Sequence, residues 1–282
     1  IFVIFCRRGE YRYTKVGRSW LIAMKKIAAI LAGVLLLGGC SAAVQTNSGG
    51  YYGIDNTSSG WGFKKEQGKA PDMPEKIRTV LNEHNAVYIG SQEEKKLYLT
   101  FDEGYENGHT TQILDTLAEK KVPAAFFVTG DYFNRSNDLV ARMISEGHIV
   151  GNHTYYHHNL AKLSDPDKIA QELSLLQDNF REQFGCEMKY MRPPEGEYSE
   201  RVLAVSADMG YKTVFWSFAY KDWLADDVRG ADYAVSQVVP YFHNGAILLL
   251  HAVSADNAAA LGRIIDSARE QGYEFASLDA LG

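Results

Sequence analysis

The chain has 282 residues, of which 46% are hydrophobic and 23% are charged, a composition that is ordinary for a soluble globular protein. Residues 1–39 hold seven of the 29 basic and one of the 35 acidic residues, so the remainder has a formal net charge of −12. A chain this acidic is a poor candidate for nucleic-acid binding.

The first 60 residues are predicted to target the chain rather than to fold with its body. Residues 1–23 show no clear periodicity, and we interpret them as an extension from a start site assigned too far upstream. Residues 24–40 have two lysines, an apolar run and small residues before Cys40, which together indicate an export signal too short for a stable span. Residues 41–60 are rich in Gly, Ser and Asn and indicate a flexible linker, so the folded body is expected at 61–282.

The end of this signal resembles a bacterial lipoprotein signal, whose cysteine is acylated after cleavage. That resemblance predicts a protein anchored through lipid on Cys40 to the outer face of the cytoplasmic membrane. A plain signal peptide or a buried helix is the alternative. With Cys6 and Cys40 set aside, Cys186 is the remaining cysteine, so we expect no intramolecular disulfide and interpret Cys186 as a small core residue.

From residue 71 onward, patterns typical of helices and strands alternate. Strands are expected at 97–102, 124–130, 148–152, 190–192, 212–217, 246–250 and 274–277. Helices are expected at 76–85, 109–121, 139–146, 165–184, 199–209, 231–241 and 257–271. The strands are apolar without alternation, as in a parallel sheet covered by helices. We therefore predict an α/β fold, a distorted (β/α) barrel with about seven parallel strands, with an open doubly wound sheet as the alternative.

Ionisable residues cluster at the carboxyl ends of these strands, where parallel α/β folds place their chemistry. The residues concerned are Asp102 and Glu103, His153 and His157, Arg192, Asp222, and His251. Five separate strand ends would thus present ionisable groups on one face. Scattered surface charge would not fall on strand ends so consistently.

His153 and His157 are four residues apart, so one helical turn would bring both imidazoles to the same side. Two neutral imidazoles form a common half-site for a divalent metal, and an oxygen ligand from Asp102 or Glu103 would complete a triad. Two solvated histidines in a polar loop are the alternative. The adjoining His158 is interpreted as a bystander or as a group that supports a ligand from behind.

These residues lie in five motifs that occur in the same order as in a known family. The motifs are Thr-Phe-Asp-Glu-Gly at 100–104, His-Thr-x-x-His at 153–157, Arg-Pro-Pro-x-Gly at 192–196, Asp-Trp at 222–223 and Leu-x-His at 249–251. Together they resemble the NodB-homology polysaccharide deacetylases, carbohydrate esterase family 4. The longer string at 98–108, with Trp-Gly-Phe at 61–63, is most similar to the delta-lactam-biosynthetic de-N-acetylases, which act on muramic acid in spore-cortex peptidoglycan.

The resemblance implies a role for each matching residue. Asp102 would be the general base, Arg192 would orient it, and His251 would be the general acid that protonates the leaving amine. Asp222 would keep His251 charged, and His153 and His157 would hold the metal. The residues implied to contact substrate are Trp223, Leu249, Pro194 and Tyr105. The alternatives are a capping acid beside a surface aromatic for Asp222 and Trp223, and a rim salt bridge for Arg192.

The chain departs from the family at Glu103, where the wider family has an Asp that binds the metal. Because glutamate is one methylene longer, Glu103 either reaches the metal differently or misses it. The metal expected from the resemblance is a divalent ion, zinc or else cobalt or manganese.

The resemblance implies de-N-acetylation of peptidoglycan, specifically of N-acetylmuramic acid on the route to the delta-lactam. A muramoyl amidase would act earlier on the same glycan strand. One alternative substrate is another acetylated polysaccharide, chitin-like or xylan. The alternative of another class is a catalytically silent carbohydrate-binding lipoprotein.

Overall fold

The structure is a computed structural model that describes residues 2–7, 10–15 and 48–281. The predicted lipid site Cys40, the whole of the predicted signal at 24–40 and residues 41–47 of the predicted linker lie outside the described residues. Within the described ranges, no helix is long and apolar enough to cross a membrane. Two strands, β1 (Phe2–Arg7) and β2 (Glu10–Lys15), pair antiparallel ahead of the body.

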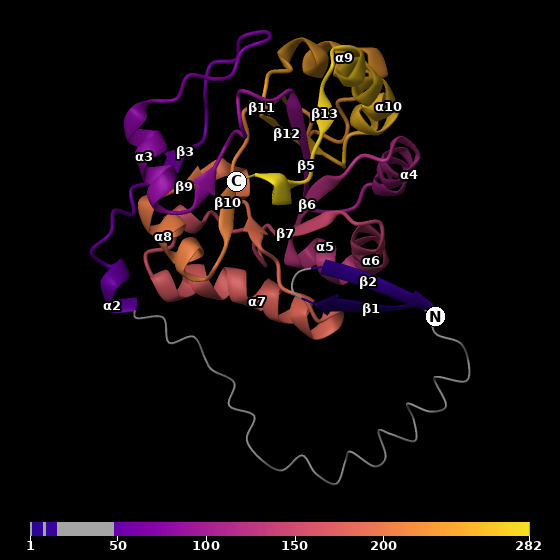
Figure 1. The fold of residues 1–282 in the computed structure, drawn as a ribbon. Coiled ribbons are helices and arrows are strands. Elements are labelled where there is room, and N and C mark those ends of the chain that lie inside the picture. The colour runs from indigo at the N-terminus through magenta and orange to yellow at the C-terminus, as the bar shows by residue number, and fades with distance from the viewer. Residues whose placement is uncertain (1, 8–9, 16–47, 282) are drawn as a thin grey trace, which may run out of the picture.

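A curled parallel sheet forms the centre of the body (Figure 1). Its strands are β4 (Ala86–Val87), β5 (Lys96–Glu103), β6 (Ala124–Val128), β7 (Ile149–Asn152), β8 (Tyr190–Met191), β10 (Lys212–Val214), β11 (Phe218–Ala219), β12 (Ala246–His251) and β13 (Glu274–Phe275). The order across the sheet is β11-β12-β5-β6-β7-β8-β10-β4, and β13 pairs separately with β5. The predicted distorted barrel of parallel strands is therefore confirmed. The two strands of this sheet that the sequence did not predict, β4 and β11, have two residues each, too few to show a periodicity.

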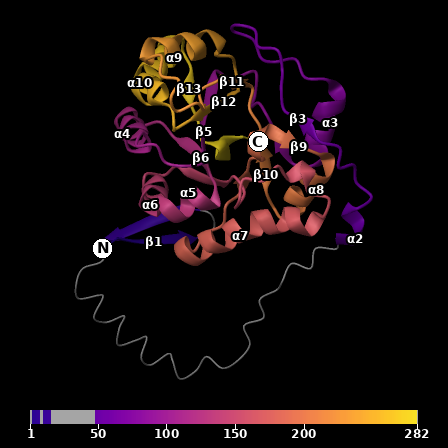
Figure 2. The same ribbon diagram turned by 180° about the vertical axis from the view of Figure 1, so that it is seen from behind.

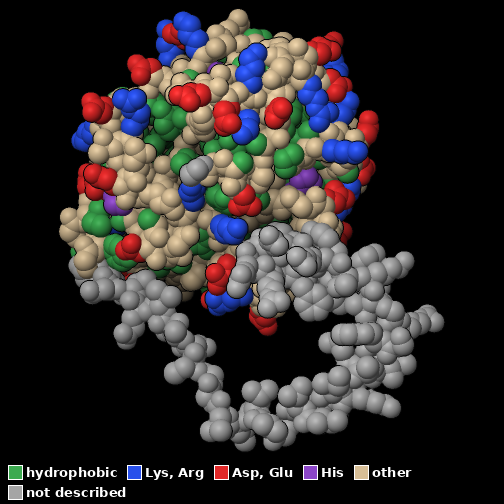
Figure 3. Space-filling view, in the orientation of Figure 1, with side chains coloured by type: hydrophobic (Ala, Val, Ile, Leu, Met, Phe, Trp, Pro, Cys, Tyr) green, Lys and Arg blue, Asp and Glu red, His purple; other side chains and the backbone are tan. Residues whose placement is uncertain are grey.

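Helices cover the outside of this sheet. The α-helices of the body are α2 (Ser48–Tyr51), α3 (Glu75–Glu83), α4 (Thr110–Lys120), α5 (Gly130–Arg135), α6 (Asn137–Ser145), α7 (Pro166–Phe184), α8 (Glu200–Asp208), α9 (Ala231–Val238) and α10 (Ala255–Glu270). Both Figure 1 and the reverse view in Figure 2 place α7 on one side of the sheet and the pair α9 and α10 on the other. Acidic and basic side chains are interspersed over the face shown in Figure 3.

Local sequence signals explain where these helices begin and end. The helix α7 begins after Asp165, whose side chain accepts from the amide of Asp167, and ends at Gly185 with φ 68°. The helix α5 was not predicted. It begins at Gly130 because the side chain of Thr129 caps the amide of Tyr132, which ends the preceding strand two residues earlier than expected.

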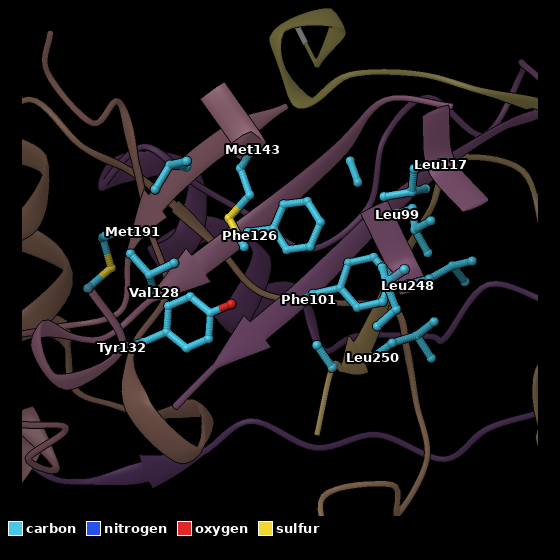
Figure 4. Close-up of a cluster of buried hydrophobic side chains, with 14 of the residues drawn as sticks. Leu99, Phe101, Leu117, Phe126, Val128, Tyr132, Met143, Met191, Leu248 and Leu250 are labelled. Carbon is cyan, nitrogen blue, oxygen red and sulfur yellow. The ribbon is translucent and has the colours of Figure 1, made fainter. Parts of the chain in front are cut away.

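Alternation along β5 sends successive side chains to two different regions, and Figure 4 shows the one that contains Leu99 and Phe101. Leu99 and Phe101 point outward, where Phe101 stacks on Phe126 at 5.1 Å between ring centroids beneath α4 and α6. Tyr98 points inward and packs with Phe127 and Ile247 in the barrel interior. The layer between sheet and helices is the larger hydrophobic cluster, and the interior is the smaller one.

The last residues of the described chain close one end of the barrel. Leu278, in the 3₁₀ helix η4 (Leu278–Ala280), and Leu281 are buried in the interior cluster with Tyr98. The strand β13 pairs with the beginning of β5, so these leucines fill the end where the strands start. The opposite end, where the strands finish, is left for the polar residues.

The two edges of the sheet nearly meet along a seam. Ile89, just after β4, forms an isolated bridge with Ala246 at the start of β12, and Gly90 donates its amide to Gly245 O at 2.8 Å. Gly245 has φ 73°, and a Cβ there would lie 2.6 Å from Gly90 O. A glycine is therefore required at residue 245 for the backbones to approach this closely.

Candidate active site

A cleft of about 1050 Å³ opens at the carboxyl ends of the strands. Side chains from five strand ends meet there, as the sequence predicted. The predicted residues that line the cleft are Asp102, Tyr105, His153, His157, Trp223, Leu249 and His251. Arg192 and Asp222 lie behind these residues, where Arg192 is hydrogen-bonded to Asp102 and Asp222 to His251. Pro194 is buried beside the cleft but does not line it, whereas the next two residues, Glu195 and Gly196, do.

Asp102 is held by a fully buried arginine. Arg192 donates from Nη1 to Asp102 Oδ1 at 2.7 Å, and its Nε donates to Val214 O at 2.8 Å. Its Nη2 donates to Thr100 Oγ1 at 3.0 Å, and the guanidinium lies 4.2 Å from the centroid of the Phe127 ring. Burial alone would raise the pKa of Asp102, but the Arg192 charge and the nearby imidazoles outweigh it and lower that pKa. Asp102 is therefore ionised and able to accept a proton.

Two neutral imidazoles lie beside this carboxylate. His153 Nδ1 is 2.8 Å from Arg192 O and donates to it in the neutral tautomer, which leaves the lone pair of Nε2 3.6 Å from Asp102 Oδ2. The His157 ring centroid lies 5.0 Å from that of His153. Burial lowers the pKa of His153 to about 4, and desolvation also lowers the pKa of His157. Both rings thus offer a nitrogen lone pair at neutral pH.

The backbone brings these histidines together differently from the expectation. The sequence argument placed them on one helical turn, but no helix covers residues 153–159. They lie in a loop in which Thr154 has φ 69° and His157 has φ 59°. The i, i+4 spacing was therefore informative about proximity and wrong about the local structure.

The donor set fits a divalent metal. Two imidazoles in the lone-pair state with a carboxylate beside them are typical ligands for such an ion, and the bond from His153 Nδ1 to a carbonyl is the support that a ligating histidine usually has. Within the described ranges, no group of three or more His, Cys, Asp or Glu is arranged to hold a metal by itself. The protein's share of such a site would therefore be centred on His153 and His157.

His251 lies on the strand next to Asp102 and is paired with it in register. Its Nδ1 is 2.8 Å from Asp222 Oδ1, and its backbone amide donates to Asp222 Oδ2 at 2.9 Å. Asn257 Nδ2 also donates to Asp222 Oδ2, at 2.6 Å. Burial by itself would lower the pKa of His251, but the Asp222 carboxylate outweighs it and raises that pKa. The Asp222 carboxylate thus favours the protonated form of this ring, on the strand next to Asp102.

Glu103 is not brought to the cleft. It is fully buried on the opposite face of β5 from Asp102, and neither of its side-chain oxygens has a hydrogen-bond partner. Its carboxyl group lies near Glu106 and Tyr132 in the layer beneath the helices. Burial raises the pKa of Glu103 well above its ordinary value, with Glu106 and Asp102 adding to the effect. A ligand role for Glu103 would require a different orientation from this one.

Sequence reasoning did not place two side chains, Trp61 and Asn257, at the site. Trp61, far upstream of the barrel strands, lines the cleft, stacks on Phe215 with ring centroids 4.4 Å apart and donates from Nε1 to Trp216 O at 2.9 Å. Its amide also donates to Gly196 O at 2.9 Å. Asn257, which holds Asp222, lies at the start of α10. Trp61 belongs to the Trp-Gly-Phe string that carries the family resemblance, but neither that string nor the residues around Asn257 show that these side chains reach the site, because each depends on a contact with a distant segment.

Comparison with known proteins agrees with the geometry. A family model described as polysaccharide deacetylase matches residues 89–214. The peptidoglycan-N-acetylmuramic acid deacetylase PdaA of Bacillus subtilis is 38% identical over 92% of this chain and 96% of its own length. The solved structure of B. subtilis PdaA, described as a family 4 carbohydrate esterase, has a TM-score of 0.78 at 40% identity and covers 81% of this chain and 98% of that one. A family 4 pseudoenzyme from Bacillus anthracis has a TM-score of 0.65 at 26% identity, covering 70% of this chain and 68% of that one.

Proposed function

Since this chain belongs to the polysaccharide deacetylase family, family 4 of the carbohydrate esterases, we propose that it removes the acetyl group from N-acetylmuramic acid in peptidoglycan. The geometry that supports this proposal is the arrangement of Asp102, bonded to Arg192, and His251, bonded to Asp222, on adjacent strands, with His153 and His157 beside them. The family is generally metal-dependent, and we propose zinc, with cobalt or manganese as alternatives, held by the two histidines.

The chain's own residues supply the proton transfers of an amide hydrolysis. Asp102 accepts a proton from the water that attacks the acetyl carbonyl, and Arg192 keeps that carboxylate ionised and aimed at the cleft. When bound, a divalent ion supplies a Lewis acid that polarises the carbonyl oxygen. His251 then donates its proton to the sugar nitrogen as the carbon–nitrogen bond breaks, which leaves acetate and a free amine. Asp222 holds His251 in the orientation and charge state that this step needs.

The lining of the cleft suits a sugar ring, and it carries one lysine beside the carboxylates of Asp102, Asp131 and Glu195. Rings of Trp61, Trp223 and Tyr105 offer apolar faces for a pyranose, and Leu249 contributes a small apolar wall. Of the described residues that line the cleft, Lys221 is the single lysine or arginine. Muramic acid differs from glucosamine by an ether-linked lactyl group that ends in a carboxyl group. A muramoyl amidase acting first would free that carboxylate, so we propose such an enzyme as an earlier step on the way to the delta-lactam of spore cortex.

Mass analysis of muropeptides tests this function directly. The purified protein is incubated with peptidoglycan, intact or freed of peptide by an amidase, with and without a chelator. We expect the mass of one acetyl group to be lost from muramic acid, faster on the peptide-free strand, and the loss to stop with chelator. Release of acetate from glucosamine residues, chitin oligomers or xylan instead would assign another substrate. A folded, metal-loaded protein inactive on every polymer would favour the catalytically silent alternative.

We also propose that lipid on Cys40 anchors the protein to the outer face of the cytoplasmic membrane. The support is the sequence at residues 24–40, with two lysines, an apolar run and small residues before the cysteine. A Cys40→Ser variant should leave the membrane fraction and appear in the soluble exported fraction, as measured by fractionation and immunoblotting. A variant that stays as firmly bound to the membrane as the parent would contradict the lipoprotein interpretation.

A further inference from the structure

We propose that Glu172, a buried residue of α7, is a positioning residue that fixes the loop carrying His157, and that it thereby sets the affinity of the two-histidine site for its metal. The inference rests on the proposed function only in taking His153 and His157 as the metal-holding pair. Glu172 lies outside the five sequence motifs, and it does not line the cleft.

The carboxylate of Glu172 reaches out of its helix to the histidine loop, residues 152–158. Its Oε2 accepts from the backbone amide of Tyr156 at 2.9 Å, and its Oε1 lies 2.6 Å from His158 Nδ1. Its backbone carbonyl also accepts from the amide of Tyr155 at 3.0 Å. Contacts from one residue of α7 therefore hold the positions on both sides of His157.

The loop has a shape that needs such support. Thr154 and His157 both adopt left-handed φ values, which cost energy for side chains other than glycine. Local bonds supply part of the restraint, since Thr154 Oγ1 accepts from the His157 amide at 3.1 Å and Asn152 Oδ1 accepts from the Thr154 amide at 2.9 Å. These bonds fix the turn internally, but they do not fix the turn relative to the rest of the barrel.

On its other side the loop is bound to the start of α5. The amide of Gly130 lies 3.1 Å from both Thr154 O and Tyr155 O, and a Cβ at Gly130 would meet Tyr155 at 2.6 Å. The histidine loop is thus held between α5 and α7. The contacts with α5 end at Tyr155. Beyond that residue, the side chain of Glu172 holds the loop against the barrel on both sides of His157, through Tyr156 and His158.

The position of Glu172 within its helix indicates a specific role, because it is not one of the carboxylates that face solvent. It is 5% exposed, and it lies beside the fully buried Ile169, Leu173 and Leu176 on the apolar face of α7. A carboxylate is costly at such a position unless it is paired and hydrogen-bonded. The side-chain partners that the structure gives it both belong to the histidine loop, whereas His158 itself is 59% exposed at its side chain.

The test is the metal affinity of a Glu172→Leu variant. Leucine suits an apolar helix face, so we expect a folded protein with a melting temperature at or above that of the parent. Titration of the metal-free protein with zinc by calorimetry should show binding weakened about 10–100-fold, the range for lost support of a metal ligand. Turnover at saturating zinc should recover towards that of the parent, because the loop is misplaced rather than deleted. Glu182→Gln, an exposed carboxylate change on the same helix, is the matched control and should bind zinc as the parent does.

A Glu172→Gln variant supplies the conservative rescue. Its amide oxygen can still accept from the Tyr156 amide, so its zinc affinity should lie clearly above that of the leucine variant. Zinc affinity unchanged in Glu172→Leu would overturn the proposal, and so would a glutamine variant that binds no better than leucine. Glu172→Met gives the same test where the leucine variant does not fold. Zinc binding is measured without substrate, so failure of the proposed deacetylation leaves this result readable on its own.

Discussion

Asp102 and Glu103 are neighbours in the chain, yet they lie in two different regions, the cleft and the layer between the sheet and its helices. Both are buried, and burial by itself would raise the pKa of each carboxyl group. Asp102 has the Arg192 guanidinium at 2.7 Å and ends with a lowered pKa, whereas the oxygens of Glu103 have no hydrogen-bond partner and its pKa stays high. The difference teaches that the partner, rather than the depth of burial, decides which carboxylate is charged. It also explains how one strand end supplies a base from only one of two adjacent acids.

The largest effect is expected when the charge on the cleft side is removed. Asp102→Asn keeps the shape of the side chain but cannot accept the proton, so turnover should fall by about 10²–10⁴-fold. Because His153 and His157 remain, the metal content should stay close to that of the parent. The measurements are acetate release and metal content on the same preparation. Near-parental turnover would show that Asp102 is not the base.

A smaller effect on turnover is expected when Asp222, the partner of His251, is changed. Asp222→Asn removes the carboxylate that raises the pKa of His251, so that pKa should fall, and activity should be lost at lower pH than in the parent. The sign follows because only protonated His251 can donate to the leaving amine. We expect turnover at neutral pH to fall about 10–100-fold and the alkaline limb of the pH–rate profile to move to lower pH. An alkaline limb at the parental pH would break the assignment of His251 as the acid.

The smallest effect on turnover is expected on the outer side of β5. The pKa of Glu103 is raised in the folded protein, so its contribution to stability is fully present below the unfolded pKa and is lost as pH rises through the folded pKa. Glutamine does not ionise, so Glu103→Gln removes this decrease in stability at higher pH. The variant should gain about 1–3 kcal/mol over the parent near pH 8 and little near pH 4. Thermal unfolding from pH 4 to 8 measures this, with turnover and metal content expected to stay close to those of the parent. A large fall in metal content would instead make Glu103 a ligand.

The same contrast separates what the sequence could predict from what it could not. Long apolar strands such as β5 and β12, and the capped helix α7, were predictable because their signals are local. The strand ends predicted the convergence of Asp102, His153 and His251, since parallel strands finish at one edge. The orientation of Glu103 was harder to predict, because a carboxylate at a strand end can turn either way in the loop that follows.

The contacts that distant segments make with the site could not be predicted, even where a segment such as Trp-Gly-Phe at 61–63 was singled out. Trp61 reaches the cleft because the residues just before it, Ser59 and Gly60, pair with the two residues that follow η2 (Pro194–Gly196). The backbone amide of Trp61 also donates a hydrogen bond to Gly196 O. Asn257 reads as an ordinary residue of a helix start until its contact with Asp222 is known. In the sequence, Glu172 is only a charged residue on an otherwise apolar helix face. The loop that it binds was predicted to be helical, but it is not. In each case the information lies in a pairing that no local pattern encodes.

The glycine seam between residues 90 and 245 has a consequence for how the protein folds. The strands on its two sides come from opposite ends of the body, and contacts of high sequence separation form slowly, which also holds for the pairing of β5 with β12. The bridge there is a single residue pair, whereas β5 and β12 share a six-residue ladder. We expect amides along the seam to exchange with solvent sooner than those of β5, as the first part of the barrel to open. Closure of the seam would then be a late kinetic step, and Gly245→Ala should slow refolding even in a protein whose catalytic side chains are all intact.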